Sequence, residues 1–155
     1  MFDRGFLGRE IHFVRWLVGL GRRGEFILAD NTRSVNVKKN IVFKVITQNQ
    51  KTQDKANTLA NKISSELKIK TLPSITAYDN FENSYKIEFV FPFEQPENSI
   101  VESIEKTDLI CSPWTVTFIR MENEIELIFN KTDNSRYRKQ YFNTILWAMW
   151  TVEQV

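Results

Sequence analysis

WTVTFIRMENEIELIFN, residues 114–130, consists of two apolar–polar alternations joined by a short polar turn. The apolar positions alternate with threonine before the turn and mostly with glutamate after it. They are Trp114, Val116, Phe118, Ile125, Leu127 and Phe129. A period of two places such side chains on one face of a strand, and Glu122 with Asn123 can form the turn. The stretch therefore predicts a β-hairpin and, with it, an antiparallel sheet.

Further strands are predicted on the N-terminal side of this hairpin. Residues 40–48 are rich in β-branched and aromatic side chains, and SITAYD (74–79) has the same character over a shorter length. Weaker signals lie at 26–29 and 30–40. Residues 85–93 alternate as clearly as the hairpin does. The side chains predicted on their buried face are Tyr85, Ile87, Phe89 and Phe91.

Four segments have the 3.6-residue periodicity of amphipathic helices. They lie at residues 6–20, at 56–67, around Ile100 and at 135–153, and Thr52 or Asp54 can cap the second. The apolar stripes are Phe6, Phe13, Leu17 and Leu20 in the first; Ala56, Leu59, Ala60, Ile63 and Leu67 in the second; Ile100, Val101 and Ile104 in the third; and Tyr141, Ile145, Ala148, Met149 and Val152 in the fourth.

The order of these elements determines the fold class that we predict. The chain has 155 residues, which is enough for one domain with a sizeable core. It contains no internal repeat and no linker long enough to divide it. Runs of strands mixed with flanking helices favour an α+β fold. We therefore expect a single α+β domain over residues 1–155, with a mainly antiparallel sheet flanked by N- and C-terminal helices.

Side chains suited to catalysis or metal binding are scarce. Cys111 is the only cysteine and His12 the only histidine, so the chain alone cannot form a disulfide or a structural Cys/His zinc site. GLGRRGE (19–25) follows a predicted helix rather than a strand, the reverse of phosphate-loop order, and we interpret it as a helix stop. Glu124 and Glu126 share a strand face, where carboxylate pairs can do acid–base work, but they fit the solvated side of the hairpin. We expect a non-enzymatic protein with no metal and no cofactor.

The cysteine content and the hydropathy pattern bear on the compartment. A lone thiol fits a reducing environment and favours a cytoplasmic protein. No run of about 18 apolar residues is present, so no transmembrane segment is predicted. The segment 6–20 can pack on its own domain or lie on a membrane surface, and the sequence leaves both open. A homodimer is also compatible with it.

The charge of the chain is unevenly distributed. Residues 1–50 contain nine Lys/Arg against four Asp/Glu, and residues 51–78 add a further excess of +3. A basic half meets the electrostatic requirement for phosphate contacts. Nucleic-acid binding or membrane-surface binding through this half is therefore the alternative function. Its basic residues are scattered over several predicted elements, and the formal net charge of the whole chain is only +2.

Residues 79–110 are strongly acidic. They contain eight Asp/Glu and two lysines, a balance of −6. Clustered carboxylates can steer a cationic protein partner and disfavour wrong ones. Internal neutralisation of the basic half is the competing interpretation. The residues predicted to bind a partner are Asp79, Glu82, Glu94, Glu97, Glu102, Glu105 and Asp108.

The C-terminal part of the chain, WTVTFIRMENEIELIFNK followed by SRYRKQYFNTILWAMW, resembles small immunity proteins of bacterial polymorphic-toxin and contact-dependent inhibition systems. The resemblance implies a cytoplasmic α+β domain without catalytic residues that neutralises a cognate toxin by covering its active site. Such toxins are often nucleases and are commonly basic, which matches the acidic segment. The net charge of +2 differs from the acidic balance of many nuclease inhibitors, so the toxin class stays open.

Overall fold

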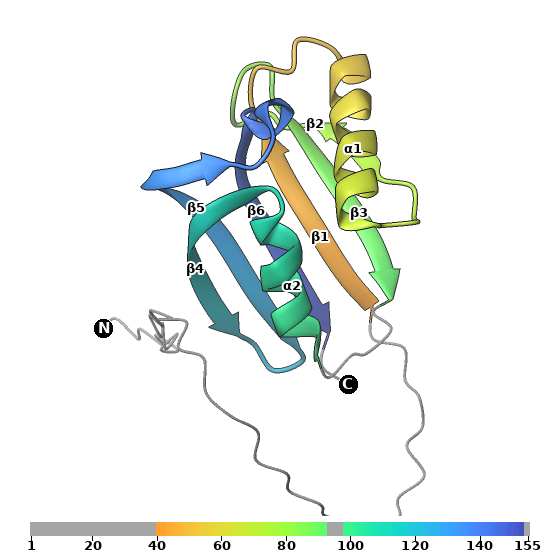
Figure 1. Ribbon diagram of the computed structural model, residues 1–155. Coiled ribbons are helices and arrows are strands. Elements are labelled where there is room, and N and C mark those ends of the chain that lie inside the picture. The colour runs from red at the N-terminus through yellow and green to blue at the C-terminus, as the bar shows by residue number, and fades with distance from the viewer. Residues whose placement is uncertain (1–39, 93–97, 154–155) are drawn as a thin grey trace, which may run out of the picture.

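The computed structural model describes residues 40–92 and 98–153. This part of the chain forms six strands, with two α-helices and one 3-10 helix placed between them (Figure 1). In chain order they are β1 (Asn40–Thr47), α1 (Gln53–Leu67), β2 (Ser74–Ala77), β3 (Tyr85–Pro92), α2 (Ser99–Asp108), β4 (Cys111–Arg120), β5 (Glu124–Tyr137), the 3-10 helix η2 (Gln140–Phe142) and β6 (Ile145–Glu153).

The strands form one antiparallel sheet in the order β2-β3-β1-β6-β5-β4. Both helices lie on the same face of it (Figure 1). The helix α1 contacts β2 and β3 at one edge, and α2 contacts β6 and β4 on the other half. The described residues therefore form two layers, and the second face of the sheet has no described helix over it.

The core lies between the sheet and the helices. Its centre is a group of rings from three adjacent strands, in which the Trp150 ring lies 4.2 Å from that of Phe43 and 5.8 Å from that of Phe91. Phe89 stacks on Phe43 from the other side at 5.9 Å. Each ring buries a large apolar area, so this cluster supplies much of the driving force for folding.

The helix α1 follows from its sequence in a simple way. Thr52 is its N-cap, and the Thr52 side chain accepts a hydrogen bond from the backbone N–H of Lys55. The predicted apolar stripe is the buried face, and Lys68 ends the helix in the left-handed conformation. The helix predicted at 56–67 is thus confirmed, including one of its two candidate caps.

The strands predicted at 40–48, 74–79 and 85–93 are confirmed as β1, β2 and β3, and the hairpin at 114–130 as β4 and β5. The α+β class and the antiparallel sheet are confirmed as well, but α1 and α2 lie between strands rather than at the chain ends. The predicted strands at 26–29 and 30–39 and the predicted helix at 6–20 lie outside the described residues.

The helix predicted at 135–153 is wrong. Residues up to Tyr137 still belong to β5, and the chain then passes through η2 into β6. The strand β6 fills the middle of the sheet between β1 and β5. It has apolar side chains toward both faces, so its nearly continuous apolar run also matches a helical stripe. Pairing with two long strands satisfies its backbone on both sides and decides the outcome.

No helix in the described ranges is long and apolar enough to cross a membrane.

Candidate functional site

The short helix α2 packs on the sheet through hydroxyl side chains. Its buried residues are Ser99, Ser103 and Thr107, not the aliphatic residues whose spacing predicted the helix. The Ser103 hydroxyl donates to the carbonyl of Ser99, and the Thr107 hydroxyl donates to that of Ser103, each at 2.6 Å. These bonds satisfy the buried hydroxyls within the helix itself. Side chains this small also let the helix axis approach the sheet closely.

Three further hydrogen bonds fix the rotation of α2 about its axis. Trp150 Nε1 donates to Thr107 Oγ1 at 2.7 Å in the buried core. Trp114 Nε1 donates to the Thr107 carbonyl at 3.2 Å. On another side, Lys106 Nζ donates to the carbonyl of Leu67, the last residue of α1, at 2.9 Å. The side of α2 that carries Lys106 therefore points toward α1.

This rotation places the aliphatic residues of α2 away from the core centre. Ile100 and Ile104 lie on the side of the helix opposite Lys106, toward β4, and are partly buried against the core. Val101 lies on the outer side with 57% of its surface exposed. The neighbouring edge strand contributes partly buried Val116 and Phe118. We call this surface the α2–β4 face; it consists of Ile100, Val101, Ile104, Val116 and Phe118.

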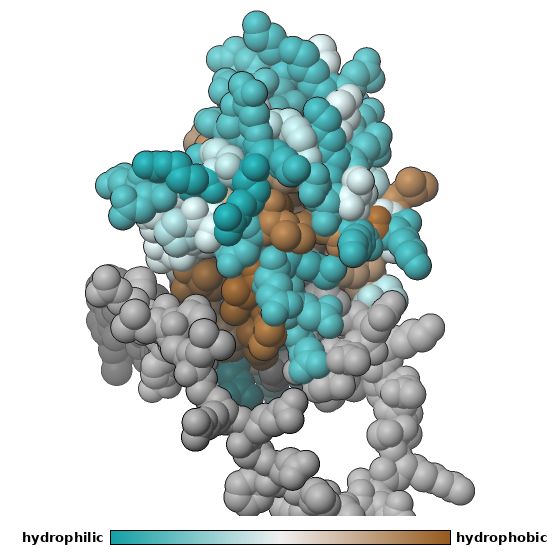
Figure 2. All heavy atoms as spheres, viewed as in Figure 1, coloured by the Kyte–Doolittle hydropathy of each residue, from teal (hydrophilic) through white to brown (hydrophobic). Residues whose placement is uncertain are grey.

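The space-filling view shows the same feature. Apolar atoms gather over the region where Figure 1 draws α2 and β4, while most of the surface around α1 is hydrophilic (Figure 2). Contiguous exposed apolar surface on a folded domain marks an interaction site more often than scattered single residues do. Because the spacing of Ile100, Val101 and Ile104 predicts a single buried stripe, the sequence alone gave no signal that Val101 is exposed.

The acids predicted to bind a partner divide into two groups. Glu105 is exposed on α2, and Glu102 and Asp108 are half-buried on it. Asp79 and Glu82 are exposed in the β2–β3 loop, at the sheet edge farthest from β4. The structure thus brings three of the acids together on α2 and places two elsewhere. The remaining two, Glu94 and Glu97, lie outside the described residues.

The acids on α2 border the exposed valine. Glu105 and Asp108 are four and seven residues after Val101, so they lie on the same side of the helix. Among the described residues, ion pairs join Glu88 to Lys44 and to Lys86, each at 3.8 Å, and none involves an acid of α2. An apolar centre with carboxylates beside it is the arrangement expected of a docking surface for a cationic protein.

Asp108 is less available than Glu105. Burial raises the pKa of its carboxyl, and the positive charge of Arg138 opposes that rise. Arg138 Nε also donates to the Asp108 backbone carbonyl at 3.0 Å. Asp108 is therefore a half-buried carboxyl at the C-terminal end of α2, and the exposed Glu105 is the carboxylate that a partner can reach most easily.

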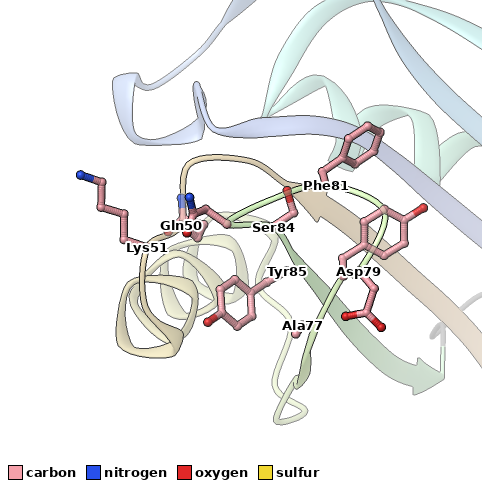
Figure 3. A pocket seen from close by; sticks show the side chains of 9 residues that line it. Gln50, Lys51, Ala77, Asp79, Phe81, Ser84 and Tyr85 are labelled. Carbon is pink, nitrogen blue, oxygen red and sulfur yellow. The ribbon is translucent and has the colours of Figure 1, made fainter.

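A shallow pocket of about 230 Å³ lies beside the β2–β3 loop (Figure 3). Gln50 and Lys51 line it from the segment after β1, and Asp79 and Phe81 line it from the loop. The loop is held by backbone bonds, such as the one from Gln50 N to the Asn83 carbonyl at 2.8 Å. In Figure 3 the side chains of Lys51 and Asp79 point in opposite directions. The pocket therefore gathers no charged pair that could act on a substrate.

Other chemistry is sparse in the part of the chain that the structure describes. No three His, Cys, Asp or Glu side chains there lie close enough to hold a metal ion. Cys111 is fully buried, and burial raises the pKa of its thiol, which disfavours the reactive thiolate. His12, the only histidine of the chain, lies outside the described residues.

One of the two lysines of α1, Lys62, is engaged within the domain. Lys62 Nζ lies 4.5 Å from the centre of the Tyr141 ring, and the Tyr141 hydroxyl donates to Glu66 at 2.6 Å. That hydrogen bond, together with partial desolvation, raises the pKa of Tyr141. One cation of the helix is therefore engaged within the domain and has an acid nearby, which weakens the case for phosphate binding here.

Comparison with known proteins adds no further information. The chain matches no protein-family model, no curated protein and no solved structure.

Proposed function

We propose that this protein is a non-enzymatic protein-binding domain whose α2–β4 face docks a cationic partner. The observation that carries the proposal is Val101, a large apolar residue that is 57% exposed on the outer side of α2, beside the partly buried residues of the α2–β4 face. Such a side chain can enter a pocket of a partner and act as a hot spot. Glu105 and Asp108 beside it would orient the partner and raise its association rate.

Within this class we propose an immunity protein that neutralises a cognate toxin by occluding its active site. The proposal is supported by the resemblance of residues 114–131 and 135–150 to immunity proteins and by the carboxylates of α2. A nuclease with a basic active-site cleft is the toxin class that those carboxylates fit best. Asp79 and Glu82 lie at the far edge of the sheet, and a partner would need to span the domain to reach both groups.

The test uses the gene immediately upstream of the coding sequence. Its product is expressed with and without this protein, growth is scored, and the affinity of the purified pair is measured by calorimetry. We expect protection by the wild type. Val101→Arg should weaken binding by about 30-fold, since truncating or blocking a hot spot costs about 2 kcal/mol. The separate variant Glu105→Lys should also weaken binding, and its affinity deficit relative to the wild type should grow as the salt concentration is lowered.

Matched controls are available in the same chain. Leu72→Arg changes a residue 93% exposed in the α1–β2 connection, and Glu82→Lys reverses a loop carboxylate. Both should bind as the wild type does. Full affinity of the Val101→Arg variant would reject the α2–β4 face. A wild-type protein that fails to protect would reject the immunity role, and steeply salt-dependent binding to nucleic acid would favour the alternative function.

A further inference from the structure

The second face of the sheet, the one opposite α1 and α2, carries several apolar side chains. They alternate along the strands with the core residues and come from five of the six strands. Val42 is the register partner of Val90, and Ile128 is that of Met149, so they form adjacent pairs. We call this surface the second sheet face; its apolar residues are Val42, Ile46, Val90, Ile119, Ile128, Trp147 and Met149.

The second sheet face mixes these apolar side chains with polar ones such as Lys44, Glu88 and Thr151. An antiparallel sheet that meets water on one side normally alternates apolar and polar residues cleanly. Here Val90 is 48% exposed, Ile46 beside Trp147 is fully buried, and the other five apolar side chains are partly buried. No described helix covers them. Partly exposed apolar side chains on an uncovered sheet face are compatible with another segment or molecule packing on it.

We propose that residues 6–20 of the same chain cover the second sheet face. That segment has a wide apolar stripe and is predicted to be an amphipathic helix, which needs an apolar surface to pack on. It precedes β1, which begins at Asn40 and lies between β3 and β6 in the interior of the sheet. The occupant and the surface are thus joined by one short stretch of chain.

The length of the connection permits this arrangement. Residues 21–39 can span at most roughly 60 Å when fully extended, whereas six strands at about 4.8 Å spacing make a sheet only about 24 Å wide. Tethering through a connection of this length gives an effective concentration in the millimolar range. An apolar segment on the same chain therefore competes favourably with a second copy or a separate partner.

The charges are complementary too. Residues 1–39 contain eight Lys/Arg and four Asp/Glu. On the second sheet face, Lys44 and Lys86 are both paired with Glu88. Glu124 and Glu126 are half-buried on the same face near the hairpin turn and have no ion pair among the described residues. The charge left over on this face is negative. Residues 6–20 bring Arg9 and Arg15 against Glu10, and most of the positive charge lies in the connection, residues 21–39.

The proposal is tested on the full chain by placing a photo-crosslinking benzophenone amino acid at Met149, on the second sheet face, or at Val101, on the α2–β4 face. Mass spectrometry maps the products. The probe at 149 should crosslink to residues 6–20 of the same molecule, with a yield unchanged by about tenfold dilution. The probe at 101 should not reach that segment. Crosslinked dimers from 149, or products elsewhere in the chain, would overturn the proposal.

A second measurement does not depend on the probe. Hydrogen exchange of residues 6–20 should accelerate by about tenfold or more in Ile128→Asp and in Leu17→Asp, because each places a charge in the proposed contact. Leu72→Asp, at an exposed residue on the α1–β2 connection, should leave it unchanged. Equal exchange in the wild type and in Leu17→Asp would contradict the proposal even if Ile128→Asp failed to fold. These results are independent of whether Val101 binds a partner.

Discussion

Replacing Thr107 by valine tests what holds α2 on the sheet. The two side chains have nearly the same shape, but valine cannot accept the hydrogen bond from Trp150 Nε1, which lies 2.7 Å from Thr107 Oγ1. Both residues are fully buried, so water cannot take the place of the hydroxyl. A buried donor that loses its acceptor costs about 1–3 kcal/mol. The added methyl group returns roughly 1 kcal/mol of apolar burial.

We therefore expect Thr107→Val to lower the free energy of unfolding by about 1 kcal/mol, the middle of the roughly 0–2 kcal/mol that remain. Urea denaturation, followed by far-UV circular dichroism, measures it as a lower midpoint at an unchanged slope. The same change in a Trp150→Phe background should cost almost nothing, because phenylalanine has no N–H to leave unpaired. If packing alone held the helix, Thr107→Val would be at least as stable as the wild type. That outcome would refute the reasoning.

Two further predictions concern ionisable groups at the ends of α2 and β4. Cys111 is fully buried, and burial raises the pKa of its thiol. A disulfide reagent should therefore modify it about a hundredfold more slowly in the native protein than in concentrated urea. Equal rates in the two conditions would contradict the buried position of the thiol. The pKa of Asp108 is raised in the folded state, chiefly by burial, so its contribution to stability falls as pH rises from 3.8 through the folded pKa. Asp108→Asn should consequently be more stable than the wild type at neutral pH and lose this advantage at pH values below 3.8. Urea denaturation at the two pH values measures the difference. A variant less stable than the wild type at neutral pH would argue against burial as the dominant cause of the raised pKa.

The strands with one apolar and one polar side could be predicted from the sequence. Alternation in residues 85–93 and 114–130 set both the element and the face that is buried, because a period of two has no helical equivalent. The register in which Val116 faces Phe129 then follows from the tight turn. The helix α1 was equally accessible, since its cap at Thr52 and its apolar stripe agree with each other.

The strand β6 could not be predicted in this way. Trp147 and Met149 lie on one face and Ala148 and Trp150 on the other, and all four are apolar, so periodicity gives no preference between helix and strand. What decides is the sheet itself. The strands β1 and β5 offer backbone groups on either side, and only an extended segment can pair with both. That information is tertiary and is absent from a local window.

The helix α2 was predicted as an element but not in its orientation. A pattern of apolar residues assumes that the most apolar side faces the core. Here the rings of Trp114 and Trp150 bring N–H donors to the helix, and Thr107 supplies an acceptor to each. Satisfying both donors outweighs the burial of one more aliphatic side chain, because each orphaned donor alone would cost about as much as that burial would gain. The exposure of Val101, on which the proposed function depends, is a consequence of that balance.

The charge of a segment and the charge of a surface are different quantities, and residues 79–108 illustrate why. The strand β3 crosses the middle of this segment, and its eight residues span about 26 Å. Acids before the strand are therefore held at one end of it, while α2 lies over the other half of the sheet. Glu88, within the strand, is paired with two lysines. A sum over the sequence adds these situations together, whereas among the described acids of this segment only those on α2 lie on the same helix as Val101.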